Sequence, residues 1–167
     1  MKDIKKEELG LVDQIILVCR DKHGKVKWIT DTNKEKKSNS MAKTGMAQVA
    51  GLILTDVGGT AFDYVGIGTG TTAESADHTD LITPVKRKAG TGTRITTTFT
   101  NDTSQLVATF SSGDTLSGSS NIAEAGVFTA VSAGVMLFRK IFTAKTVNWD
   151  DGDTLEVTAK CQMKQGA

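Results

Sequence analysis

The sequence predicts a mainly β domain of the α+β class: an antiparallel β-sandwich or jelly-roll-like module with one helix and an N-terminal hairpin. Thr is the commonest residue, and 17 Gly but only one Pro occur among 167 residues. This composition suits short strands joined by many turns. Apolar segments with strand-like alternation recur along the chain, and a single segment has helical spacing. At this length we expect one compact domain overall.

The N-terminal part of the chain has three expected pieces. Residues 1–10 form a charged arm that we expect to become ordered on a partner. Residues 11–18 and 26–29 are two strands around a polar turn ending at Gly24, which predicts a β-hairpin. After a Lys-rich loop at 32–40, Ser38 or Ser40 can cap a helix over 41–54. Its apolar residues at helical spacing are Met46, Val49, Ala50 and Ile53.

The hairpin and helix make up residues 11–60, and we expect residues 61–167 to form an antiparallel β module. Its strands are predicted at 62–67, 93–99, 105–110, 124–129, 135–142 and 154–163, with loops at 68–78 and 111–121. In the strand at 124–129, a period of two places Glu124 and Phe128 on one face and Ala125 and Val127 on the other. If buried, the Glu124 carboxylate needs a hydrogen bond or a salt bridge.

Several motifs resemble ligand sites without meeting their requirements. Gly66, Gly68 and Gly70 follow a strand, but the spacing is wrong for a dinucleotide loop, so these glycines indicate a turn or a close backbone approach. The acidic turn at 148–153 lacks the spacing of a calcium loop and is better explained as a hairpin turn. Cys19, His23, His78 and Cys161 lack the paired spacing of zinc ligands. We therefore expect no cofactor and no metal.

The sequence also gives no sign of an enzyme. It has no Gly-x-Ser-x-Gly motif, and both histidines fall in polar turns. The basic cluster at 86–88 lacks interleaved aromatics, which favours a solvated sheet edge over a nucleic-acid surface. The net charge is only +1, and the chain has neither a long apolar run nor a signal core. We expect a soluble product made in the cytoplasm that binds neither nucleic acid nor membrane.

Charge and cysteine placement add two expectations. Lysine is concentrated before position 43, whereas 56–80 is acidic, a pattern that fits either subunit packing or two solvated surfaces. Cys19 and Cys161 fall inside strand-like segments, which favours two reduced buried thiols and leaves a single disulfide open.

Three segments together resemble tailed-bacteriophage structural proteins. The first runs from Tyr64 to Leu81 and contains the repeated glycines. The second joins residues 122–128 to the strand at 135–142, which includes Arg139, and the third is the closing strand from Asp153 to Thr158. The resemblance includes attachment domains of tail-collar fibres and small head and tail proteins, and it covers about 62–160.

The resemblance implies a virion protein. The leading hypothesis for its function is capsid decoration, with binding to the major capsid protein. The second is a tail or collar/fibre attachment adaptor. An alternative of another class is a host-glycan-binding β module. The resemblance also implies a homotrimer. We expect the apolar run at 135–138 to lie nearest its shared core, because the side chains of this run are apolar on both strand faces. The interface candidates are Lys5, Lys6, Lys34, Lys36, Lys37, Glu124, Phe128 and Arg139.

Overall fold

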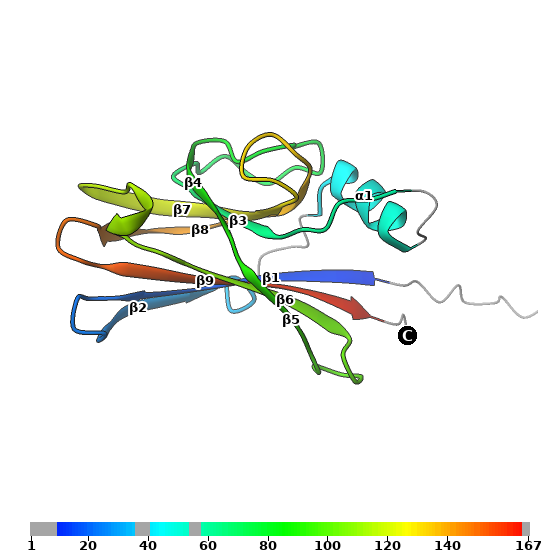
Figure 1. Cartoon of the computed structure of the whole chain (residues 1–167), viewed down its shortest axis with the longest axis horizontal. Coiled ribbons are helices and arrows are strands. Elements are labelled where there is room, and N and C mark those ends of the chain that lie inside the picture. Colours follow the sequence, from blue (N-terminus) through cyan, green and yellow to red (C-terminus); the bar gives the residue numbers. More distant parts are fainter. Residues whose placement is uncertain (1–9, 36–40, 54–57, 165–167) are drawn as a thin grey trace, which may run out of the picture.

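The protein is a sandwich of two antiparallel sheets with one helix at one end (Figure 1). The computed structural model describes residues 10–35, 41–53 and 58–164. This architecture confirms the expected mainly β class, the antiparallel sandwich and the helix.

Sheet A has five strands in the order β2-β1-β9-β6-β5. Sheet B has four strands in the order β4-β3-β7-β8. The strands of sheet A are β1 (Gly10–Arg20), β2 (Val26–Asp31), β5 (Thr91–Ile95), β6 (Thr103–Phe110) and β9 (Thr154–Lys164). Those of sheet B are β3 (Tyr64–Gly68), β4 (Pro84–Ala89), β7 (Ser119–Phe128) and β8 (Met136–Asn148).

The N-terminal hairpin is an integral part of sheet A. β1 pairs with β2 as expected, and it also pairs with β9 along its whole length, from Gly10 opposite Lys164 to Arg20 opposite Thr154. The two ends of the described chain thus lie side by side in the sheet. Residues 11–60 and 61–167 therefore contribute strands to the same sandwich.

Strand β4 was not predicted. The basic residues Lys86, Arg87 and Lys88 lie on it, and it forms an edge of sheet B. This placement agrees with the expectation of a charged sheet edge. β4 leads through Gly90 directly into β5 of the other sheet. A Cβ at Gly90 would lie 2.8 Å from the Leu106 side chain, so the chain crosses between the sheets where only glycine leaves room.

Alternating residues of both sheets fill the core between them. Ile15, Leu17, Phe110, Val127 and Leu155 are all buried in it. Side chains also close the open sides of the sandwich. The Trp28 indole on β2 donates to the Thr146 carbonyl on β8 at 3.0 Å, and Lys88 on β4 donates to the Thr109 carbonyl on β6 at 2.7 Å.

Helix α1 (Lys43–Ile53) confirms the predicted helix but packs through an unexpected face. Met46 and Ile53 are 46% and 75% exposed, whereas Ala42 and Gly45 are buried. A Cβ at Gly45 would lie 2.5 Å from the Met136 carbonyl oxygen. The helix therefore approaches β8 through its smallest residues, because larger ones would hold the two backbones apart.

Gly45→Ala is expected to destabilise the protein by about 1–3 kcal/mol through overpacking against the β8 backbone. In an exposed helix interior the same change would stabilise by about 1 kcal/mol. The exposed Thr44→Ala on the same helix serves as the control and should leave stability nearly unchanged. Denaturant unfolding of the three proteins measures the difference, and stabilisation by Gly45→Ala would contradict the close packing.

Candidate functional site: a buried ion pair beneath the 69–83 loop

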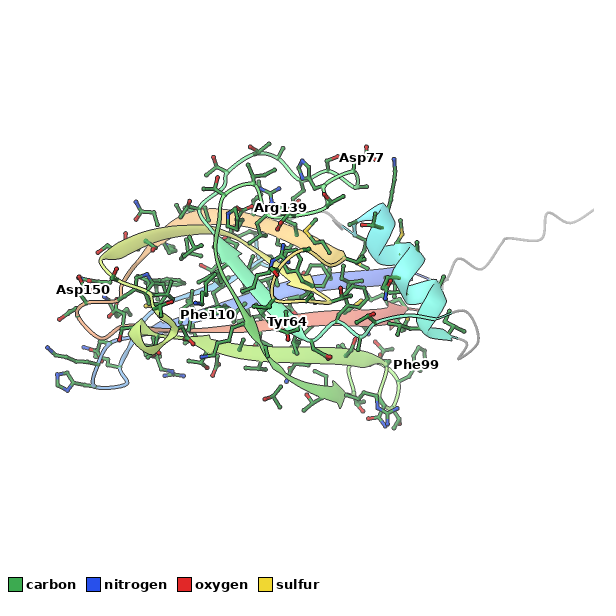
Figure 2. All side chains as sticks on the ribbon, turned by 45° about the horizontal axis from the view of Figure 1, so that its top comes forward. Tyr64, Asp77, Phe99, Phe110, Arg139 and Asp150 are labelled. Carbon is green, nitrogen blue, oxygen red and sulfur yellow. The ribbon has the colours of Figure 1, made fainter. Side chains whose placement is uncertain are left out.

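A fully buried ion pair lies on the outer face of sheet B. Glu124 on β7 and Arg139 on β8 meet with 2.5 Å between Oε2 and Nε, and their side chains are 0% and 1% exposed. Both residues lie beneath the segment at 69–83, which we call the covering loop. Figure 2 labels Arg139 on this side of the molecule and Asp77 on the loop near α1. The structure thus confirms that Glu124 has a polar partner.

The Glu124 carboxylate also organises the covering loop. Gly70 and Thr83 donate backbone N–H groups to Oε1 at 3.0 and 2.8 Å, and Ile82 donates to Oε2 at 3.1 Å. These donors come from the start and the end of the loop. One carboxylate therefore closes the loop at both ends and pairs with Arg139.

Two of the three repeated glycines are explained by the same carboxylate, and the third by the neighbouring Phe128 side chain. A Cβ at Gly68 or Gly70 would lie 2.5 or 2.6 Å from Glu124 Oε1, and a Cβ at Gly66 would lie 2.8 Å from the Phe128 ring. This confirms the sequence interpretation of a close backbone approach. The groups approached are side chains of β7 in the same protein, because Glu124 and Phe128 occupy the space that these glycines leave open.

The middle of the loop is held by Arg139 and β8. Arg139 donates to the Thr72 carbonyl at 2.9 Å and lies 3.4 Å from His78 Nδ1. The Glu74 carboxylate accepts the Ile141 backbone N–H at 2.8 Å. At the β4 side, the Arg87 guanidinium stacks 3.6 Å over the Phe128 ring and pairs with Asp80. The loop is thus attached to sheet B along most of its length.

The arrangement is suited to holding a loop, because the Glu124 carboxylate is enclosed and its oxygens accept hydrogen bonds from four donor groups. His78, whose Nδ1 lies 3.4 Å from Arg139, is partly exposed at this site. The sequence signal for it was the single carboxylate in an otherwise apolar strand. Its partner could not be identified in advance, since Arg139 opposes Gly126 in the β7–β8 register.

The structure corrects three of the interface candidates. Glu124, Phe128 and Arg139 are 0%, 0% and 1% exposed, because the covering loop encloses the ion pair and Phe128 packs with Leu81 and Met136. The apolar run expected at a shared core is likewise internal: Met136, Leu137 and Phe138 are 1%, 6% and 1% exposed. Lys34 is exposed in the turn after β2, and Lys5, Lys6, Lys36 and Lys37 lie outside the described residues.

Two further carboxylates are buried beside lysines. Asp13 on β1 and Lys140 on β8 lie 2.8 Å apart and are each 1% exposed, so this ion pair joins sheet A to sheet B. Asp153 at the start of β9 lies 2.5 Å from Lys27 Nζ and accepts the Asn148 backbone N–H at 2.9 Å. The acidic turn is therefore a hairpin connection in which Asp153 closes the turn.

Both cysteines are free and buried. Cys19 lies opposite Leu155, so Cys161 is six residues further along β9. That spacing is about 20 Å at 3.3 Å per residue, far beyond the roughly 7 Å limit for a disulfide. Burial, with Asp153 nearby, raises the pKa of the Cys19 thiol to about 11, and burial raises the pKa of Cys161 to about 11 with Asp13 adding to it.

Neither thiol is expected to react quickly with an alkylating reagent in the native protein near pH 8, because the reactive thiolate is scarce and the sulfur is enclosed. Both are expected to react fully once the protein is unfolded in denaturant. Intact mass measured over time counts the alkyl groups added. Rapid native labelling at either cysteine would contradict this enclosure.

An apolar groove of about 590 Å³ lies at the helix end of the sandwich and is lined by residues including Val49, Leu52, Phe62, Leu106 and Met163. It can accept apolar groups, and its lining also includes Asp63, Arg94 and Lys160. Among the described residues no cluster of three or more His, Cys, Asp or Glu could hold a metal ion. In the same part of the chain, no helix is long and apolar enough to cross a membrane.

The covering loop is thus held on sheet B by Glu124, Arg139 and the close approach of Gly68 and Gly70. Comparison of the chain with protein-family models, with curated proteins and with solved structures found no match. The function is therefore inferred from the residues and the geometry of this chain itself.

Proposed function

We propose that this chain is a structural protein of a tailed-bacteriophage particle, and that it decorates the capsid by binding the major capsid protein. It acts through assembly, with no catalytic turnover. Its place of action is the virion, after synthesis in the host cytoplasm.

The observation that carries the proposal is that two of the three resembling segments meet in one structural unit. The glycines at 66, 68 and 70 pack against Phe128 and Glu124, and Glu124 pairs with Arg139. These residues come from the first two of the three resembling segments, and the second segment contributes two neighbouring strands. Each of these residues needs the others in order to pack. This supports a resemblance to phage proteins that extends to the three-dimensional structure, beyond the composition of strands and turns.

A rigid surface loop on a sandwich also suits a protein that works by docking. The covering loop is fixed to sheet B by buried charge and backbone hydrogen bonds, so little conformational entropy is lost when it contacts a partner. The loop exposes polar residues such as Thr71 and Thr72. Neither it nor the 111–121 loop contains an aromatic residue for stacking on sugars, so the glycan-binding alternative has no specific support.

Purified particles of the phage that encodes the chain provide the test. The protein is expected to remain with particles through density-gradient purification, at a copy number comparable with that of the major capsid protein. Antibody labelling seen by electron microscopy should be spread over the head. Label at the tail or collar, with few copies, would replace decoration with attachment, and absence from washed particles would refute a virion role.

A further inference from the structure

Of the four edge strands in the described sandwich, β5 alone pairs with its neighbour without a register shift. It ends sheet A beside β6 (Figure 1), and the register from Thr91 to Ile95 is regular. The other edge strands, β2, β4 and β8, each carry at least one extra residue relative to the strand beside them. Such bulges protect a sheet edge from pairing with another chain. Because β5 has no bulge, its edge can accept a further strand.

The free edge of β5 is also open to solvent. Four of its five residues are exposed, and only Ile95 is partly buried. In a strand with a single neighbour, alternate backbone N–H and C=O groups point away from that neighbour. In the part of the chain that the structure describes, no backbone hydrogen bond joins β5 to any segment other than β6. These outward groups are therefore available to a partner backbone.

A hollow lies directly beside this edge, on the inner face of sheet A. Gly92 is paired with Leu106, which is buried in the core, so position 92 faces the interior of the sandwich. A Cβ at Gly92 would meet no described atom within 4 Å, whereas a Cβ at Gly90 would lie 2.8 Å from the Leu106 side chain. Gly92 also lines the apolar groove of about 590 Å³, together with Phe62 and Leu106. A large apolar side chain on a strand added beside β5 can therefore enter the groove over Gly92.

Two opposite charges flank the hollow. Arg94 lies two residues after Gly92 and on the same face of β5. The Asp63 carbonyl accepts the Gly90 N–H at 2.8 Å, which places Asp63 beside the residue two positions before Gly92. Both side chains are exposed and line the groove, and neither has an ion-pair partner among the described residues. Lys160 also lines the groove, but it occupies an alternate position of β9 that faces the outer side of the sheet. At 3.3 Å per residue, the acidic and basic ends of the site are about 13 Å apart.

We infer that β5 and the groove bind an extended segment of another protein, which adds to sheet A as a further strand. The segment carries a large apolar residue opposite Gly92, an acidic residue opposite Arg94 and a basic residue toward Asp63. These three residues occupy alternate positions, since alternate side chains of a strand share a face. Pairing is antiparallel, the slightly more stable arrangement, so the acidic residue comes first along the segment. Main-chain hydrogen bonds supply affinity, and the groove and the two charges supply specificity.

A capped peptide with the sequence Thr-Asp-Thr-Leu-Thr-Lys-Thr tests this recognition. Calorimetric titration of the full chain should show one peptide bound per chain. Hydrogen exchange should slow at the amides of residues 91–95 and stay unchanged at β2, the bulged edge of the same sheet. The peptide of reversed sequence has the same composition and is the matched control. It should bind at least about five-fold more weakly, because it must either oppose like charges or pair in the parallel direction.

Two variants of the protein test the hollow and the charge. Gly92→Leu fills the hollow and should weaken peptide binding by about ten-fold or more, because the peptide leucine can no longer be buried. The fold should persist, since no described atom lies where the new side chain begins. Thr109→Leu, on the exposed outer face of β6, is the control and should bind normally. Arg94→Glu should weaken binding by about five-fold, and a peptide with Lys in place of Asp should restore it. Circular dichroism checks folding of each variant.

Failure of the wild-type protein to bind the peptide would overturn the inference, including the case in which a second copy or the chain's own residues already occupy the β5 edge. Equal binding of the two peptides, unchanged binding by Gly92→Leu, or slowed exchange away from residues 91–95 would overturn it as well. The inference does not depend on the virion proposal. A protein that binds no peptide but remains on purified particles would refute the strand site and leave the virion role intact.

Discussion

Glu124→Ala is expected to lower the free energy of unfolding by about 3–5 kcal/mol, because it leaves Arg139 buried without its carboxylate partner. The same change removes the acceptor for the backbone N–H groups of Gly70, Ile82 and Thr83. The covering loop should therefore detach from sheet B, and its amides should exchange hydrogen faster than those of β7. Incorporation into particles should fall if the loop docks on the capsid.

Chemical denaturation measures the loss, and hydrogen exchange locates it. Glu35→Ala, at an exposed carboxylate in the turn after β2, is the matched control and should change stability by less than about 0.5 kcal/mol. The double variant Glu124→Leu/Arg139→Met should be less destabilised than the sum of the two single variants, since no charge is left buried alone. Wild-type melting of Glu124→Ala together with normal incorporation would refute the role of the ion pair.

Lys140→Met is expected to cost a similar amount, about 3–5 kcal/mol, for a different structural reason. Lys140 and Asp13 connect the two sheets in the interior, and removing the lysine leaves the Asp13 carboxylate facing the core. The loss should affect the whole sandwich, because β1 and β8 belong to different sheets. The midpoint of the cooperative unfolding transition should therefore move to a lower denaturant concentration as a single transition.

Replacing both members of this pair tests whether the lost stability comes from a buried charge left without its partner. Asp13→Leu/Lys140→Met should recover most of the stability lost in either single variant, because two apolar side chains need no counter-charge. Lys145→Met on the same strand, where the lysine is partly exposed, is the control and should be nearly neutral. Equal destabilisation by the single and double variants would show that Lys140 contributes through something other than its charge.

Much of this architecture was predictable from local patterns. The alternation in 11–18 and 26–29 and the intervening turn identified the hairpin, and the registers of β1 with β2 confirm it. The period of two around Glu124 correctly separated Ala125 and Val127, which face the core, from Glu124 and Phe128, which do not. Such patterns succeed because strand geometry links each residue to a face of its sheet, whichever strand comes to lie beside it.

What the sequence by itself determined, then, was the class of the fold, most of its strands and the need of Glu124 for a partner. Only the tertiary structure decided which partner it has. Arg139, the covering loop and the 66–70 glycines converge on it from separate segments, and Asp13 finds Lys140 across the sandwich. These contacts depend on sheet order and on the crossing at Gly90, which are set by long-range packing of the whole core and leave no local signature in the chain.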